Sequence, residues 1–111
     1  MATMHEPTFA ILTSLATGPR HGYAIMSDVK EVTHGAINLQ PGTLYGALER
    51  LRGDGQIEVA GEEVVNGRLR RSFALTPRGA ELLRSEAARR RTAADRALSR
   101  LDAFGGVAVS Q

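Results

Sequence analysis

The last third of this 111-residue chain contains a long stretch without helix-breaking residues. Thr76-Pro77 is a typical helix start, because threonine caps a helix and proline suits its first turn. No glycine or proline follows between residues 80 and 104. A helix over residues 77–104 has about 28 residues and a length of about 42 Å. Because a domain of this size is narrower than that, we expect part of the helix to project and to need a partner.

The same segment carries a heptad pattern, the spacing at which two helices pack along a shared seam. Its apolar positions are Leu83, Ala87, Ala94, Ala97, Leu101 and Phe104. Arg90 is the one polar residue in the pattern, and we expect residues 89–91 to form a solvated face with Arg90 in interchain ion pairs. The pattern predicts a dimerisation helix over residues 77–104, followed by a flexible tail at residues 105–111.

The composition excludes several classes of protein and site. The absence of cysteine excludes a disulfide framework, a zinc ribbon and a thiol nucleophile. No apolar run exceeds four residues, which is too few to span a bilayer, and the first residues lack the pattern of a signal peptide. His5, His21 and His34 lack the spacing of metal ligands. We expect a cytoplasmic, non-enzymatic protein with no metal, no cofactor and no membrane partner.

The formal net charge of +2 is unevenly distributed along the chain. Residues 1–67 carry four basic and eight acidic side chains, whereas residues 68–76 carry three arginines and no acid. Residues 77–111 carry seven arginines and four acids. The positive charge is thus concentrated in the last two-fifths of the chain, which favours a polyanionic partner such as nucleic acid.

Three shorter helices are predicted before the long one. Apolar residues at helical spacing, bounded by glycine and proline, indicate helices over residues 7–15, about 21–34 and about 41–52. His21, in the turn between the first two, is expected to cap a helix or to pack rather than to act as a catalyst or ligand.

Strand patterns occupy the region between the third helix and the long one. Residues 56–65 and 68–75 are predicted strands, joined by Asn66-Gly67, the pair that a tight hairpin turn prefers. Residues 37–39 alternate in polarity and predict one further, very short strand. Alternation assigns Ile57, Val59 and Val65 to one face of the first hairpin strand and Leu69, Arg71, Phe73 and Leu75 to one face of the second.

We infer a mainly α fold with a small β-hairpin (α+β). Residues 1–76 form a winged helix-turn-helix, and one long C-terminal dimerisation helix follows. In a winged helix-turn-helix the third helix enters the major groove of DNA, and the hairpin, or wing, lies along the neighbouring backbone.

Five short motifs resemble the PadR family of bacterial transcriptional regulators, in the same order and spacing. They are Gly18-Pro19-Arg20-His21-Gly22-Tyr23, Pro41-Gly42-Thr43-Leu44-Tyr45, Gly55-Gln56-Ile57, Asn66-Gly67-Arg68-Leu69-Arg70-Arg71 and Leu75-Thr76-Pro77. The single helix after the wing is similar to the smaller subfamily. The resemblance implies a homodimeric winged-helix repressor, often sensing a small molecule at its dimer interface.

The chain departs from the family pattern in the wing and in its lack of tryptophan. The family usually has proline where Leu69 stands and aromatic residues near Ser72 and Phe73. Some small members stack planar drugs on a tryptophan in the dimer-interface helix, and this chain has no tryptophan. That mode of ligand capture is therefore not expected.

The candidate DNA-binding residues lie on the second helix, the third helix and the wing. They are Tyr23, Gln40, Pro41, Gly42, Thr43, Tyr45, Arg50, Arg68, Arg70 and Arg71. The amino end of the third helix approaches base edges, the start of the second helix favours a phosphate, and wing arginines neutralise the backbone.

Each of these assignments has a structural alternative. Tyr45 could pack half-buried on the second helix, and Tyr23 could be a core tyrosine. Thr43 could cap its own helix, and Arg50 could pair with Asp54 or remain solvated. The wing arginines could protect a solvated edge strand.

The expected function is sequence-specific DNA binding by a homodimeric transcriptional regulator. We expect a ligand-responsive repressor on a near-palindromic operator, with double-stranded DNA, a second copy and a small-molecule effector at the dimer interface as partners. The alternative is a winged-helix module for protein–protein assembly without specific DNA binding. The acidic residues Glu49, Glu58, Glu62 and Glu63 near the DNA face suit that alternative.

Overall fold

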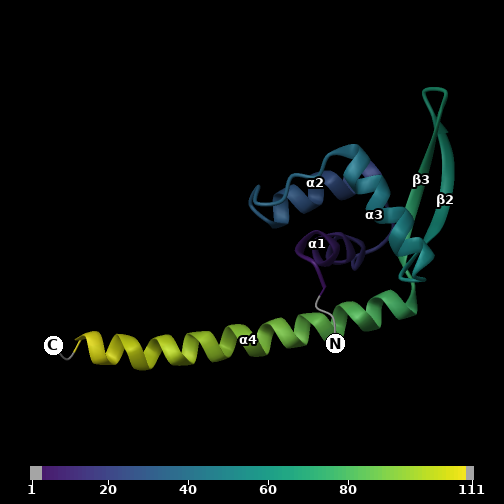
Figure 1. Ribbon diagram of the computed structural model, residues 1–111. Coiled ribbons are helices and arrows are strands. Elements are labelled where there is room, and N and C mark those ends of the chain that lie inside the picture. The colour runs from purple at the N-terminus through teal and green to yellow at the C-terminus, as the bar shows by residue number, and fades with distance from the viewer. Residues whose placement is uncertain (1–3, 110–111) are drawn as a thin grey trace.

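Residues 4–109, the part of the chain that the computed structural model describes, form four helices and a three-stranded antiparallel sheet (Figure 1). In chain order the elements are α1 (Glu6–Leu15), β1 (Arg20–His21), α2 (Gly22–Val32), α3 (Pro41–Gly53), β2 (Ile57–Val65), β3 (Arg68–Leu75) and α4 (Pro77–Val109). The predicted α+β class and the winged helix-turn-helix are confirmed.

One apolar core holds α1, α2, α3 and the base of the hairpin together. Ile11 of α1, Ile25 of α2 and Leu48 of α3 are fully buried. Ile57 and Phe73 close the core from the hairpin, and each is 2% exposed. Because burial of one such side chain contributes about 1.5–3 kcal/mol, this core fixes the three helices relative to the wing.

The third strand of the sheet is not the predicted one. β1 pairs antiparallel with β3, in the order β1-β3-β2, so that Arg20 lies opposite Phe73. Residues 37–39 form no strand, and the prediction there was wrong. Leu39 is buried and Ile37 packs against the core, so their alternation reflects core packing without strand pairing.

The hairpin turn is confirmed, but one face assignment in β2 is wrong. Asn66 and Gly67 both have positive φ, at 52° and 76°, as a tight two-residue turn requires. The pairing of β2 with β3 is irregular between Val59 and Gly61. This irregularity shifts the alternation by one residue, so that Val64 rather than Val65 pairs with Leu69 on the face of Ile57.

Helix α4 starts as predicted and is held against the hairpin base. The Thr76 hydroxyl accepts from the Gly79 N–H at 3.0 Å and donates to the Gly55 carbonyl at 2.6 Å. A Cβ atom added at Gly79 would lie 2.0 Å from the Gln56 carbonyl oxygen. The start of the helix therefore packs directly on the backbone that precedes β2.

The far part of α4 projects away from the domain, toward the C-terminus in Figure 1. The helix runs to Val109, so the predicted end at residue 104 and the start of a tail at residue 105 were wrong. Residues 110–111 of that predicted tail lie outside the described residues. Every side chain from residue 91 to residue 104 is exposed, and the molecule measures 68 × 27 × 21 Å.

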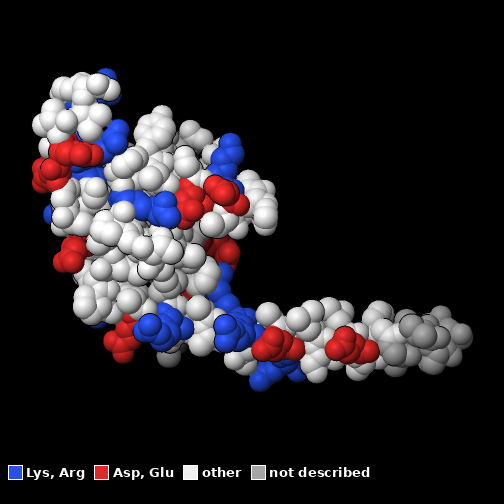
Figure 2. All heavy atoms as spheres, turned by 180° about the vertical axis from the view of Figure 1, so that it is seen from behind, with Lys and Arg blue, Asp and Glu red and all other residues white. Residues whose placement is uncertain are grey.

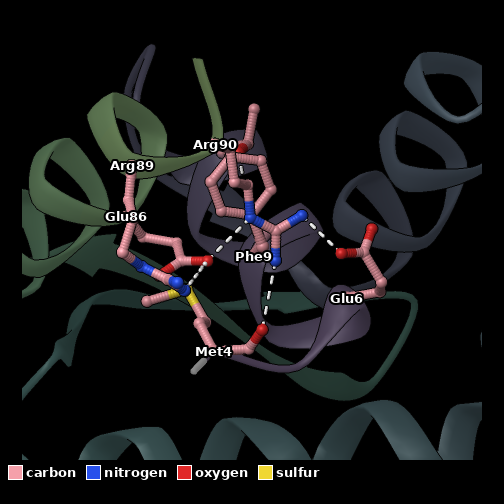
Figure 3. A network of polar contacts seen from close by, with 7 residues as sticks. Met4, Glu6, Phe9, Glu86, Arg89 and Arg90 are labelled. Atoms are coloured by element: carbon pink, nitrogen blue, oxygen red, sulfur yellow. Dashed lines mark hydrogen bonds and ion pairs between the residues drawn. The ribbon is translucent and has the colours of Figure 1, made fainter. Parts of the chain in front are cut away.

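The near part of α4 is fastened to α1 by a cluster of charged groups (Figure 3). Arg90 bonds to Glu86 on its own helix, to Glu6 on α1 and to the Met4 carbonyl, and its guanidinium stacks on Phe9. Hydrogen bonds from Arg89 and Arg90 hold the pKa of the Glu86 carboxyl below its ordinary value.

Two positions of the predicted dimer seam, Leu83 and Arg90, therefore make contacts within their own chain. Arg90 makes ion pairs within its own chain, to Glu6 and Glu86, so the prediction of interchain pairs lacks support. Leu83 packs against the core of its own domain. Only the heptad positions beyond Arg90 lie on the projecting part of the helix.

Candidate nucleic-acid interface

The amino end and outer face of α3 are exposed. Leu44, Ala47, Leu48 and Leu51 point into the core and are at most 8% exposed. The residues predicted to reach DNA lie on the remaining surface, and all of them are exposed: Gln40, Pro41, Gly42, Thr43 and Tyr45. The helix thus has the orientation that a recognition helix needs, with its packing face inward and its amino end open.

The helix-capping alternative for Thr43 has no support in the structure. Gln40 is the N-cap residue of α3 and makes no side-chain capping bond. Among the residues described, the Thr43 hydroxyl has no hydrogen-bond partner. An exposed hydroxyl in the first turn is available to a ligand.

The start of α2 is capped by His21 and presents Tyr23 to solvent. The His21 Nδ1 accepts from the Ala24 N–H at 3.3 Å, which confirms the predicted capping role. Tyr23 is 72% exposed, so the alternative of a core tyrosine is wrong. The dipole of this helix end favours an anion beside Tyr23.

Tyr45 combines the two alternatives considered for it. The side chain is 47% exposed, but its hydroxyl end rests on α2. A Cβ atom added at Gly22 would lie 2.4 Å from the Tyr45 hydroxyl oxygen. Because Gly22 has no side chain, the end of the Tyr45 ring packs against α2 there and connects the exposed faces of α2 and α3.

The wing and the two helices surround one open hollow of about 660 Å³. Tyr23 and Tyr45 line it from the helices, and Arg68, Arg70 and Arg71 line it from the wing. The structure therefore brings together five of the predicted DNA-binding side chains, from three elements. Glu49 lines the same hollow and is the acidic residue among them.

The wing is less positive than the sequence of β3 alone suggests. Glu62 lies 3.7 Å from Arg71, and Glu63 lies opposite Arg70 in the strand register. Figure 2 shows basic and acidic side chains next to each other on the hairpin. Arg68 lies opposite Val65, so it is the wing arginine that faces no acidic residue on the other strand.

Arg50 does not join the other candidates. Its Nη2 donates to the Thr8 hydroxyl of α1 at 3.2 Å, and the side chain lines a second hollow with Glu86 and Arg89. The predicted alternative of a pair with Asp54 is also not seen among the described residues. Arg50 therefore links α3 to α1, on a surface separate from the tyrosines and the wing.

Sequence reasoning missed an exposed apolar pair near the tip of the wing. Val64 and Leu69 pair across the two strands and are 72% and 60% exposed. The sequence signal for this pair is Gly61, because a glycine inside a strand pattern suggests a bulge. The extra residue of the bulge moves Val64 onto the face of Leu69.

Neither a metal site nor a membrane span occurs in the part of the chain described by the structure. Its histidines, aspartates and glutamates form no cluster of three or more that could hold a metal ion. None of its helices is long and apolar enough to cross a membrane.

Residues 11–85 match the transcriptional regulator PadR-like family. The chain belongs to this family. The match covers the helix-turn-helix, the wing and the first turns of α4, so the five predicted DNA-binding side chains that line the 660 Å³ hollow lie within it.

Two curated relatives share part of their length with this PadR-family chain. An uncharacterized protein in a transposon, from Streptomyces fradiae, is 46% identical over 83 residues, which are 75% of this chain and 22% of that protein. A transcriptional regulator from Mycobacterium tuberculosis is 42% identical over 50 residues, which are 45% of this chain and 46% of that protein. The chain thus aligns with less than half the length of either relative.

Solved structures of the family have the same fold. A PadR family transcription regulator from Clostridium difficile is 23% identical, with a TM-score of 0.74 over 87% of this chain and 99% of that one. Bacillus subtilis PadR, solved in complex with operator DNA, is 25% identical, with a TM-score of 0.63 over 70% of this chain and 44% of that one.

We predict that replacing Gly22 by alanine moves the Tyr45 ring and leaves the fold intact. The three atoms nearest to the new methyl group would all belong to the half-exposed Tyr45 side chain, so the free energy of unfolding should change by less than about 1 kcal/mol. Urea unfolding and the NMR shifts of the Tyr45 ring measure the two effects. Gly79→Ala is the control, because its methyl group would meet backbone and should cost about 1–3 kcal/mol. Equal losses for both variants would contradict this account of Tyr45.

Proposed function

We propose that this chain is a cytoplasmic, homodimeric transcriptional repressor that binds a near-palindromic DNA operator and has no enzymatic activity. The observation that carries the proposal is the common surface formed by the start of α2, the open face of α3 and the wing. Two tyrosines and three arginines from these elements surround one hollow. Such a surface suits a duplex, which offers phosphates at its edges and base edges in its groove.

The elements of this surface have different roles in the proposal. The wing arginines and the start of α2 bind phosphates and supply most of the affinity. Gln40 and Thr43, at the open amino end of α3, contact base edges and supply the specificity. In a dimer, two α3 helices read successive major-groove half-sites, about one helical turn apart.

The projecting part of α4 supports the dimer. Leu98, Leu101 and Phe104 are 60%, 59% and 69% exposed, and Ala94 and Ala97 continue the stripe at heptad spacing. Figure 2 shows this part of α4 standing clear of the domain. We propose that the same stripe of a second copy covers it, since an exposed apolar stripe along a projecting helix needs a partner.

A small-molecule effector at the dimer interface completes the proposal. Small residues at heptad positions of the projecting part, Ala94 and Ala97, favour close packing of the two helices rather than a wide cavity. An effector would therefore act by repacking the α4 helices and changing the separation of the wings, which requires different affinities for two dimer states.

We predict that Arg70→Ala and Thr43→Ala affect DNA binding in different ways. Arg70→Ala should weaken binding to operator and random DNA alike, and the slope of log K against log salt should flatten by about 2, because a dimer loses two phosphate contacts. Thr43→Ala should leave the slope unchanged and cost about 1–3 kcal/mol per half-site on the operator only. Anisotropy titrations at several salt concentrations measure both.

The opposite pattern would contradict these roles. A change in base preference for Arg70→Ala, together with a change in salt slope for Thr43→Ala, would mean that Arg70 contacts bases and Thr43 contacts phosphate. An operator obtained by selection from random DNA serves for these titrations. Failure of the protein to select any sequence would favour the protein–protein assembly module instead.

We predict that Leu101→Glu separates the dimer. An unpaired carboxylate in the seam should raise the dimer dissociation constant by at least about tenfold, because burial of a charge is costly. Ser99→Glu is the matched control, since it adds the same charge two residues away on the opposite side of the helix. Sedimentation equilibrium measures both variants. If Leu101→Glu dimerises as well as Ser99→Glu, the outer part of α4 is not the interface.

A further inference from the structure

Among the described residues, Arg90 is the last residue of α4 that makes a hydrogen bond or ion pair to another element of its own domain. Its Nε donates to Glu86 at 2.8 Å and its Nη2 to the Met4 carbonyl at 3.1 Å, and Nη1 bonds to Glu6. The guanidinium carbon lies 4.0 Å from the centre of the Phe9 ring. Figure 3 shows these groups gathered around one guanidinium.

The residue type matches this role. The planar guanidinium can bond through several edges while its face stacks on an aromatic ring, which a lysine ammonium cannot do. Arg90 also occupies a heptad position at which a seam would otherwise have an apolar residue. One heptad position is thus occupied by a residue that connects α4 to α1 within the same chain.

This connection determines the direction in which α4 leaves the domain. The helix packs on the domain from Gly79 to Leu83 and is attached again at Arg90, about 10 Å beyond Leu83 at 1.5 Å per residue. If the attachment at Arg90 were lost, a pivot of about 10° at Leu83 would move Leu101 by about 5 Å. One base-pair step is about 3.4 Å, so a pivot of this size exceeds the spacing between neighbouring base pairs.

We propose that Arg90 is a positioning residue that sets the half-site spacing of the operator, by fixing the angle between the dimer seam and the DNA-binding face. The proposal rests on the proposed function, in which α4 joins two DNA-binding domains. In the proposed role, Arg90 need not contact DNA or the partner. It acts through Glu6, Phe9 and Glu86.

The test uses the full-length protein and operators whose half-sites are moved apart or together by one or two base pairs. Wild type should lose at least about tenfold in affinity for a one-base-pair change, because the second half-site then also rotates around the duplex. Arg90→Gln should lose less than about threefold on the same change, while its affinity for a single half-site stays at the wild-type value. Arg91→Gln, one residue away and exposed, is the control and should keep the wild-type discrimination.

A folded, dimeric Arg90→Gln protein with wild-type discrimination would overturn the proposal. If Arg90→Gln does not fold, Glu6→Gln provides the comparison, because it removes one contact from a carboxylate whose side chain is 69% exposed. A second measurement needs no DNA: spin labels at Val64→Cys, an exposed strand position of the wing in a chain without other cysteines, report the wing-to-wing distance in the dimer. The distance distribution should broaden with Arg90→Gln, and an unchanged width would overturn the proposal.

This design separates the two hypotheses. If wild type selects no operator, the proposed function fails, whereas the spin-label comparison still decides whether Arg90 holds the two domains at one separation. If wild type selects an operator and Arg90→Gln discriminates half-site spacing as strongly as Arg91→Gln does, the proposed role of Arg90 fails and the proposed function stands.

Discussion

Burial of the projecting part of α4 is the interaction on which the proposed assembly depends. In a single copy, every side chain from residue 91 to residue 104 is exposed, and these include Leu98, Leu101 and Phe104. Covering each of these large side chains contributes about 1.5–3 kcal/mol. A second copy that covers them also holds two DNA-binding faces at a defined separation, which a pair of half-sites requires.

Features that follow from local rules could be predicted from the sequence. The Asn66-Gly67 turn needs two residues with positive φ, and His21 and Thr76 precede helices that they cap. Helical spacing also identified the inward face of α3, and with it the exposed residues at its amino end. Each of these features is determined by residues a few positions apart, so the interactions that cause it can be identified in the sequence.

Contacts between distant segments could not be predicted. Arg50 bonds to Thr8, 42 residues earlier, and Arg90 bonds to Glu6, 84 residues earlier. The sequence of each helix alone favours a phosphate contact for Arg50 and an interchain ion pair for Arg90. The wing shows the same limit, because the excess positive charge assigned to β3 is reduced by Glu62 on the opposite strand. Strand pairing, rather than composition, determines the charge that a wing presents.

A hydroxyl-radical footprint of the wild-type protein on its selected operator tests the central claim most directly. The central claim is that two copies, joined through α4, place α3 in successive major-groove half-sites. It predicts two protected regions related by a near-palindrome and centred about 10 base pairs apart, on one face of the duplex. A single protected region, or two regions without a fixed separation, would contradict it.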